Sequence, residues 1–510
     1  MSAMAFGAAC TPGHNPLLYQ VNTRTWLHEI SAELGRTATL DDIPDADLDE
    51  LAASGFDLIY LLGVWRTGAA ARAVSRSNAK WRKDFEAALS DLTEEDICGS
   101  SFALTGYSVA KELGGDEALE RLRTRLHDKG LSLILDFVPN HTAPDHPWVR
   151  EHPEYYVRGT EEDLAREPQN YARSEDMIFA HGRDPYFDGW PDTLQLDYSN
   201  PALQTAMKNE LARVAERCDG VRCDMAMLVL PHVFERTWAV SGLPFWPEAI
   251  ATVKERHPQF LFMAEVYWDL EWELQQQGFD YTYDKRLYDR LVEGHAPAVR
   301  DHLRAALDFQ ERSARFLENH DEPRAAVTFP FDKHRAAAVV AFCCPGLRFF
   351  HEGQAEGAKL RSPTHLCRRA REPVDERMIL FYTALLGCLS SPAVRQGYWH
   401  LIDCLPAWDG NWTDDCFVAQ AWRGDEGSRL VSVVNFAPNR SQCYLPMPFS
   451  DLGGTPWLLV DRLGRARYRR DGDSLMSPGL YLDLAPWGYH VFELLPETDQ
   501  SFSGTASPFR

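Results

Sequence analysis

The residue pattern best suited to chemistry is Gly220-Val221-Arg222-Cys223-Asp224. Alternate residues of a strand point to the same side, so Arg222 and Asp224 would share one face of a strand here, with Cys223 on the other. The planar fork of donors on arginine keeps a neighbouring carboxylate ionised and fixes its direction. A charged carboxylate aimed from a strand end is what a nucleophile for sugar chemistry requires. For an isolated Arg-x-Asp pattern, a buried structural ion pair would be the better interpretation.

Other chemically useful residues stand at the ends of apolar segments elsewhere in the chain. Glu265 and Asp321 each end such a segment, and His141 follows a third one that carries Asp136 at its base. Like charges crowded into one pocket raise at least one pKa, which separates an acid from the bases. Each residue also has a structural interpretation, as an ion-pair partner, a helix N-terminal residue or a core histidine. That interpretation must place three carboxylates at three strand ends independently, which is its weak point.

The elements that must position these residues are apolar strands alternating with amphipathic helices. Before Gly220, for example, Leu203, Met207, Leu211 and Val214 recur with helical spacing. Such alternation is typical of a parallel sheet covered on both faces, and eight units predict a closed (β/α)8 TIM barrel. An open doubly wound sheet is the alternative, but no Gly-rich phosphate loop follows the first strand. The expected strands are 17–22, 56–62, 131–138, 221–224, 260–265, 279–281, 315–319 and 347–350.

Two stretches interrupt this alternation. About 80 residues separate the third and fourth strands, far more than one crossover needs, which predicts a small irregular domain inserted over the barrel mouth. Near residue 400 the chain changes to short strands broken by Gly, Pro, Asn and Asp, which predicts an antiparallel β-sandwich. The expected domains are 1–140 and 201–400 for the barrel, 141–200 for the insertion, 401–497 for the sandwich and 498–510 for a loose tail.

Composition excludes several classes of partner. The 510 residues carry 52 Lys plus Arg against 75 Asp plus Glu, a net charge of −23 that repels phosphate backbones, so nucleic acid is not expected. Eleven cysteines, an odd number without zinc-site spacing, favour reduced thiols in a cytoplasm. Residues 1–15 lack the pattern of a signal peptide, and no apolar run has the length of a membrane span. We therefore expect a cytoplasmic protein without a membrane partner; the oligomeric state cannot be inferred.

The same segments resemble a known family. Asp136–His141, Gly220–Asp224, Ala264–Val266 and Glu318–Asp321 are similar, in order and in strand placement, to the four signature regions of the α-amylase family, glycoside hydrolase family 13. Shorter matches support the resemblance: Gln195–Tyr198 is similar to the motif that ends the family's inserted domain, and residues 345–354 are similar to its eighth strand and loop.

The resemblance implies a retaining, two-step displacement at an α-glycosidic bond. Asp224 would attack the anomeric carbon, and Glu265 would protonate the leaving oxygen and then activate water, with the two carboxyl groups about 5–5.5 Å apart. Asp321 would hold sugar hydroxyls and stabilise the positively charged transition state. The family pattern assigns further contacts to His141 and His320, which would bind hydroxyls, and to Arg222, which would keep Asp224 ionised.

Several positions depart from the family's amylases. Met227-Leu228 stands where a Lys-His pair usually lines the acceptor side, and Phe102 replaces the tyrosine that commonly stacks under the reacting sugar. Arg324 is similar to an arginine that closes the pocket in members acting on short α-glucosides, although it could equally be a surface residue. The first barrel loop lacks a calcium-binding ladder, while Asn140 matches a calcium position of many amylases. No cofactor is therefore expected, and a structural calcium ion is left open.

These observations predict an enzyme that cleaves α-glucosidic bonds in short α-glucans or α-glucosides, closer to α-glucosidases and transglycosidases than to typical endo-amylases. A transglycosidase, which passes the glycosyl unit to another sugar, is the alternative, because an apolar acceptor side disfavours water. A non-catalytic family member is less favoured, since all three carboxylates and no membrane span are present. A metal-dependent barrel hydrolase is favoured least. The expected partner is a carbohydrate.

Overall fold

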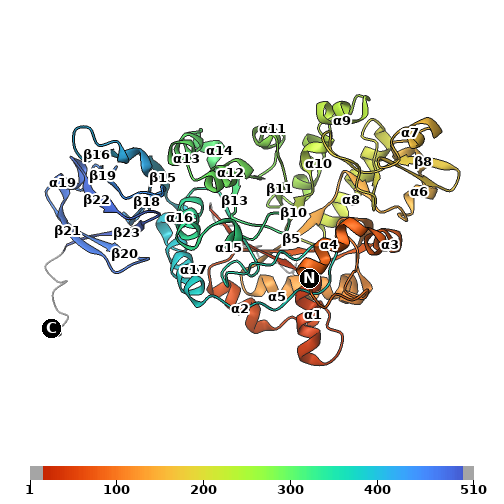
Figure 1. Ribbon diagram of the computed structural model, residues 1–510, viewed down its shortest axis with the longest axis horizontal. Coiled ribbons are helices and arrows are strands. Elements are labelled where there is room, and N and C mark those ends of the chain that lie inside the picture. The colour runs from red at the N-terminus through yellow and green to blue at the C-terminus, as the bar shows by residue number, and fades with distance from the viewer. Residues whose placement is uncertain (1–14, 498–510) are drawn as a thin grey trace, which may run out of the picture.

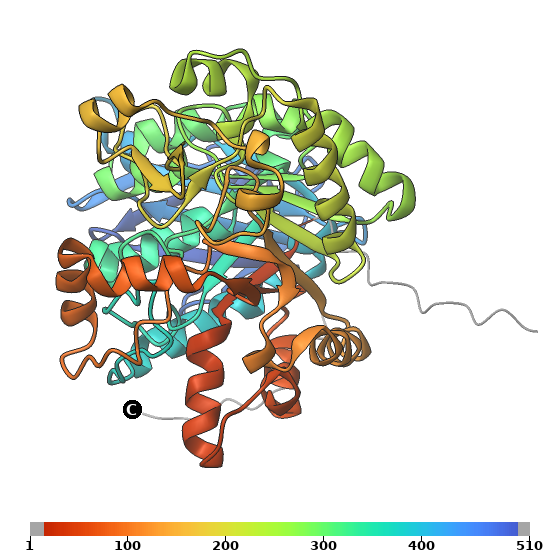
Figure 2. The same ribbon diagram turned by 90° about the vertical axis from the view of Figure 1, so that its right-hand side faces the viewer.

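The computed structural model describes residues 15–497, which form three regions arranged in a row (Figure 1). The C-terminal sheets lie at one end, the barrel is in the middle, and the segment that follows β5 lies at the other end. Figure 2 views the molecule from that last end, with the inserted segments in front of the barrel. Residues 1–14, which were expected not to form a signal peptide, and the expected loose tail 498–510 lie outside the described residues.

The central region is a closed parallel barrel, which confirms the predicted (β/α)8 fold class. Within residues 15–497 its strand order is β1-β14-β13-β12-β11-β10-β5-β2. Parallel pairing leaves all the strand C-termini at one mouth, where the residues that follow each strand can converge. The strands are β1 Leu17–Asn22, β2 Leu58–Leu62, β5 Ser132–Phe137, β10 Gly220–Cys223, β11 Leu261–Ala264, β12 Tyr281–Tyr283, β13 Ser313–Arg315 and β14 Leu347–His351.

Two strands are displaced from their expected positions. The sixth was expected at 279–281 and is Tyr281–Tyr283; the seventh was expected at 315–319 and is Ser313–Arg315. Phe316 and Leu317 are buried but belong to no strand. An apolar run predicts which residues are buried, but a strand also needs a neighbouring strand to pair with. The buried residues and the strand residues therefore differ where the chain leaves the barrel.

Helices cover the outside of the barrel, and α8 (Pro201–Ala215) shows why they form where they do. The Asn200 side chain accepts a hydrogen bond from the N–H of Ala202, Pro201 occupies the first turn, and the predicted apolar stripe is buried. The other helices of eight or more residues are α1 Thr23–Leu34, α2 Asp45–Ala53, α3 Ala69–Ser77, α4 Ala79–Ala88, α5 Gly115–Asp128, α9 Pro231–Trp238, α10 Trp246–Arg256, α12 Lys285–Glu293, α13 Ala296–Leu303, α16 Phe331–Phe342 and α17 Glu376–Leu389.

The chain after β5 leaves the barrel and returns to the same place. Strand β6 (His141–Thr142) pairs antiparallel with β9 (Leu194–Gln195), with His141 opposite Gln195. This pairing fixes the base and the end of the insertion side by side at the barrel mouth. Between them lie α6 Trp148–Glu151, α7 Glu161–Arg166 and the hairpin of β7 Tyr171–Ser174 and β8 Met177–Ala180.

The C-terminal region is a sandwich of two antiparallel sheets, as predicted. The larger sheet has the order β15-β17-β18-β23-β20-β21 and the smaller one β16-β19-β22. Their inner faces share a core that includes Phe417, Val431, Cys443 and Leu482. The strands are β15 Tyr398–Ile402, β16 Leu405–Pro406, β17 Phe417–Arg423, β18 Arg429–Asn435, β19 Ser441–Leu445, β20 Pro456–Asp461, β21 Arg467–Asp471, β22 Leu480–Leu484 and β23 Tyr489–Pro496. Across residues 15–497, no helix has both the length and the apolar character needed to cross a bilayer.

Candidate active site

The barrel mouth contains a cavity of about 320 Å³ in which Asp224, Glu265 and Asp321 meet. Asp224 follows β10 directly and Glu265 follows β11, so strand pairing alone brings them together. The N–H of Asp224 donates to the carbonyl of Phe137 (2.8 Å) and that of Glu265 to the carbonyl of Cys223 (3.0 Å). The lining residues are Trp81, Ser100, Phe102, His141, Trp190, Asp192, Thr193, Asp224, Met225, Glu265, Tyr267, Asp321, Thr364 and His365.

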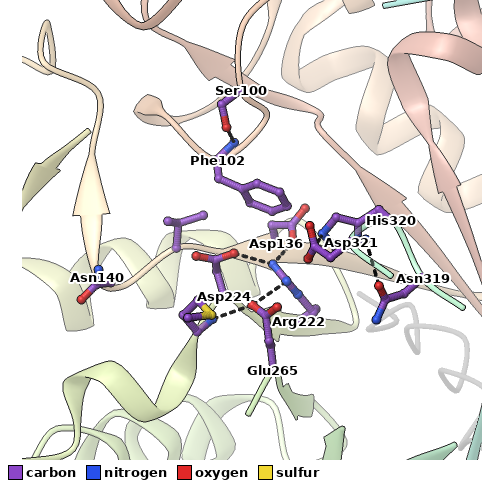
Figure 3. Close-up of polar contacts among 12 residues, drawn as sticks. Ser100, Phe102, Asp136, Asn140, Arg222, Asp224, Glu265, Asn319, His320 and Asp321 are labelled. Atoms are coloured by element: carbon purple, nitrogen blue, oxygen red, sulfur yellow. Dashed lines mark hydrogen bonds and ion pairs between the residues drawn. The ribbon is translucent and has the colours of Figure 1, made fainter. Parts of the chain in front are cut away.

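The guanidinium of Arg222 is fully buried among carboxylates (Figure 3). Its Nη1 donates to Asp224 Oδ1 at 2.7 Å, and its Nη2 forms an ion pair with Glu265 Oε2 at 2.6 Å. A third carboxylate, that of Asp136 below the mouth, lies 3.4 Å from Nη1 and accepts a 2.5 Å hydrogen bond from Tyr60. The predicted contact of Arg222 with Asp224 is present, and the same cation also reaches Glu265.

Both carboxyl groups on Arg222 have raised pKa values. Burial raises the pKa of Glu265, Arg222 opposes this, and the negative charges of Asp224 and Asp321 add to the rise. Burial likewise raises the pKa of Asp224 against the effect of Arg222. Glu265 is held in place because its Oε2 accepts a hydrogen bond from the N–H of Met225 (2.8 Å) and its Oε1 accepts one from the Tyr267 hydroxyl (2.9 Å). A fixed carboxyl group with a raised pKa is suited to carrying a proton to a leaving group.

Asp321 has the opposite electrostatic setting. The Asp321 side chain is 49% exposed. Partial desolvation in the cavity opposes its ionisation, but the charge of His320 and a hydrogen bond from that side chain outweigh this effect and hold the pKa of Asp321 well below its usual range. His320 Nε2 lies 3.0 Å from Asp321 Oδ2, while its Nδ1 lies 2.8 Å from Gln20 Nε2. The two ring nitrogens of His320 therefore contact Asp321 on one side and Gln20 on the other, which fixes the direction of the ring. The site therefore pairs a carboxylate that stays charged with one that can hold a proton.

The other predicted contacts His141 and Phe102 also line the cavity. The His141 ring centroid lies 5.3 Å from that of Trp190, and burial lowers the pKa of His141 to about 3, so the ring is neutral. The Phe102 ring centroid lies 5.4 Å from that of His320 and 5.1 Å from Arg222 Cζ. A neutral imidazole and an apolar ring are suited to hydroxyl and ring faces of a sugar.

A family model for the alpha-amylase catalytic domain matches residues 104–361, just over half of the chain. The chain belongs to the alpha-amylase family. Among curated relatives, Alpha-amylase MalA of Haloarcula japonica is 28% identical over 398 residues, which are 76% of this chain and 54% of the relative. The alpha-1,4-glucan:maltose-1-phosphate maltosyltransferase of Pseudomonas aeruginosa is 28% identical over 242 residues, which are 46% of this chain and 31% of the relative.

Solved structures of the family share the fold. A maltogenic alpha-amylase, AmyB from Thermotoga neapolitana, superposes with a TM-score of 0.66 at 18% identity, covering 94% of this chain and 99% of that one. An alpha-amylase from Lactobacillus plantarum gives a TM-score of 0.65 at 20% identity, covering 94% and 99%. At these identities the likeness establishes the fold alone. The chain spans about half the length of the first curated relatives it matches.

Three residues that were singled out in comparing the chain with the family's amylases do not line the catalytic cavity. Arg324 does not line the catalytic cavity: its guanidinium is buried, pairs with Glu318 at 2.5 Å and donates to the carbonyl of Glu352 at 2.7 Å. It is therefore not a surface residue, and together with His320 it lines a neighbouring cavity. Met227 and Leu228 were expected on the acceptor side, but the short 3₁₀ helix Ala226–Val229 turns both into the core. Met225, in a left-handed conformation (φ 43°), lines the cavity instead.

The calcium position of many family members, Asn140, lies in a hydrogen-bonded and buried setting here. The side-chain oxygen of Asn140 accepts a 3.0 Å hydrogen bond from Gln195, and the residue is buried. In the part of the chain that the structure describes, no three His, Cys, Asp or Glu side chains are grouped so that they could hold a metal ion.

Several cavity residues were missed in the sequence. Tyr267 stands two residues after Glu265, and Trp190 and Asp192 stand just before the Gln195–Tyr198 motif, so a search around each motif would have found them. Trp81 and His365 gave no such signal. They come from long segments far apart in the chain, and only the fold brings their rings to a centroid distance of 4.7 Å.

Asp192, in the cavity wall, is expected to make the stability of the protein depend on pH. It is 3% exposed, and within residues 15–497 no group donates a hydrogen bond to its Oδ2. Burial raises its pKa from 3.8 to about 7. The folded state therefore binds this proton more tightly than the unfolded chain, and the resulting stability is complete below about pH 4 and lost as pH rises through about 7. As pH rises over that interval, the free energy of unfolding of Asp192→Asn is expected to increase by roughly 3–5 kcal/mol relative to that of the wild type.

Urea unfolding of both proteins from pH 4 to pH 8 measures this difference. The exposed Asp188→Asn, in the same inserted segment, is the control and should follow the wild-type curve at every pH. A constant difference between Asp192→Asn and the wild type would contradict the raised pKa.

Proposed function

We propose that the chain is a retaining α-glycoside hydrolase that acts on short α-glucans or α-glucosides. The observation that carries this proposal is the sharing of one buried guanidinium by Asp224 and Glu265, at 2.7 and 2.6 Å. Carboxyl groups bound to the two terminal nitrogens of one guanidinium are held close together. This favours the separation of about 5–5.5 Å used by retaining enzymes over the gap of about 6.5–9.5 Å that inverting enzymes need for a water molecule.

In the proposed reaction, Asp224 attacks the anomeric carbon as Glu265 gives its proton to the departing oxygen. A glycosyl-enzyme ester forms on Asp224 and the aglycone leaves as an alcohol. Glu265, now ionised, takes a proton from water, whose oxygen attacks the same carbon and releases Asp224. Asp321, held ionised by His320, stabilises the positive charge of both transition states. Every proton is carried by a side chain, so the reaction needs no cofactor.

The alternative proposal is a transglycosidase, in which a sugar hydroxyl replaces water in the second step. Trp81, Trp190 and Met225 give the cavity wall apolar surfaces on which an acceptor sugar can bind. A relative named as a maltosyltransferase is consistent with this outcome.

We place the protein in the cytoplasm, which the free thiols of the ten cysteines in residues 15–497 support.

A proton NMR time course with maltose, maltotriose, sucrose and isomaltose tests the proposal, with Asp224→Asn run in parallel. Early release of the α-anomer, absent in the variant, is the expected result. New oligosaccharides in place of free glucose would favour the transglycosidase. Release of the β-anomer would contradict the retaining mechanism, and turnover by the variant equal to that of the wild type would contradict the site.

A further inference from the structure

Two segments that line the catalytic cavity are joined behind it by a short antiparallel bridge. Ser100 and Phe102 belong to the first segment, and Thr364 and His365 to the second. The bridge pairs Ile97 with Leu366, and hydrogen bonds on either side of it join the N–H of residue 98 to the carbonyl of 365 (2.9 Å) and the N–H of 367 to the carbonyl of 96 (3.0 Å). The relative position of these two cavity walls therefore depends on this bridge.

A pair of cysteines lies on one face of the bridge. Residues 98 and 367 flank the Ile97–Leu366 pair diagonally, so both side chains project to the face opposite those two apolar residues. Both Cys98 and Cys367 are free thiols, and both residues are partly exposed. The paired backbone holds the two thiols side by side, so a small approach of the two segments would let them form a disulfide.

A cation stands beside one of these two sulfur atoms. Arg24 Nη1 lies 3.2 Å from Cys98 Sγ and also donates to the carbonyl of Gly99 at 2.9 Å. A hydrogen bond from Cys367 together with the charge of Arg24 outweighs burial and lowers the pKa of Cys98 to about 6, while the pKa of Cys367 is raised. One thiolate beside one protonated thiol is the combination found in reactive cysteine pairs.

We propose that Cys98 and Cys367 form a reversible disulfide that controls the catalytic cavity. The Cys98 thiolate attacks one sulfur of a low-molecular-weight disulfide such as oxidised glutathione and releases one thiolate. Cys367, after losing its proton to solvent, attacks the Cys98 sulfur of the mixed disulfide and releases the second thiolate. The protein is oxidised by two electrons and the small disulfide is reduced to two thiols, so the exchange balances.

Closing this bond is expected to change the cavity shape. Diagonal neighbours on an antiparallel pair have Cα atoms about 7–8 Å apart, whereas a disulfide joins Cα atoms about 4.4–6.8 Å apart, so the two segments must approach each other. Phe102, which lies over Arg222, and His365 move with them. Displacements of about 1 Å near reacting atoms cost up to about 100-fold in rate, and we expect a loss on the order of tenfold.

The test treats the reduced full-length protein with oxidised glutathione at pH 7, blocks remaining thiols with iodoacetamide and identifies linked peptides by mass spectrometry. The expected result is a peptide pair joined through Cys98 and Cys367, a change in tryptophan fluorescence from the cavity residues Trp81 and Trp190, and a loss of turnover that dithiothreitol reverses. Cys98→Ser and Cys367→Ser are expected to have the activity of the reduced wild-type protein and to keep it after treatment with the oxidant.

Cys404→Ser is the matched control, because Cys404 and Cys443 are a second contacting pair, in the sandwich, where a hydrogen bond with Cys404 and burial raise the pKa of Cys443. This variant should respond to oxidation as the wild type does. Absence of the Cys98–Cys367 peptide, or its presence with unchanged turnover and fluorescence, would overturn the proposal. Linkage and fluorescence are measured without substrate, so a reduced protein that fails to cleave glycosides would contradict the proposed function alone.

Discussion

Replacing Asp224 with asparagine is expected to lower kcat by a factor between about 10⁴ and 10⁶, the range seen when a member of a catalytic unit is removed. Asparagine keeps the shape of the side chain but has no charge with which to attack the anomeric carbon. Arg222 keeps its ion pair with Glu265, so the cation remains neutralised and the fold should persist. Steady-state rates on maltose measure the effect.

Thermal unfolding separates a chemical loss from a structural one. The exposed Asp409→Asn, in the C-terminal region, is the control and should match the wild type in rate and in Tm. In Asp224→Gly, azide is expected to enter the vacated space and produce a β-glycosyl azide from an activated α-glucoside. A variant Asp224→Asn that keeps more than about a tenth of wild-type kcat, far above the loss expected for a nucleophile, would show that another group attacks.

The nucleophile end of this site could be predicted from sequence because the geometry involved is local. Arg222 and Asp224 share a face simply because they are two residues apart near the end of one strand. The strand itself could be predicted because an apolar run lies between a helix and a polar end. Barrel closure then brings the ends of β5, β10 and β11 to one mouth, so the convergence of Asp224 with Glu265 followed from the fold class.

The rest of the site depends on contacts that sequence spacing does not encode. The ion pair between Arg222 and Glu265 joins different strands, and its direction depends on rotamers packed by neighbours. Arg324 could be named from its motif, but its ion pair with the buried carboxylate of Glu318, only six residues earlier, could not be read from the sequence. His365 reaches the site through a long loop, which carries no periodicity to analyse.

Glu265→Gln is expected to reveal the acid and base roles through its dependence on the leaving group. Glutamine cannot give a proton, so turnover of maltose should fall by about 10²–10⁴, the usual contribution of general acid–base catalysis. A 4-nitrophenyl α-glucoside needs little protonation, and its first step should be nearly unchanged. The second step still lacks a base, so a burst of nitrophenol should precede a slow steady state. Azide should accelerate that slow step and give an α-glycosyl azide, because it attacks without losing a proton.

The pH dependence of maltose cleavage tests the acid role of Glu265 independently. Maltose cleavage needs the protonated form of Glu265, so activity must fall as pH rises through the pKa of this carboxyl group. Because burial raises that pKa, the loss should occur above the usual range of a glutamic acid, and it should be absent from the first step of Glu265→Gln on the aryl substrate. Glu271→Gln is the matched control, since burial also raises the pKa of Glu271 but the residue does not line the cavity. Equal losses on both substrates would assign Glu265 a structural role, because only a proton donor distinguishes a poor leaving group from a good one.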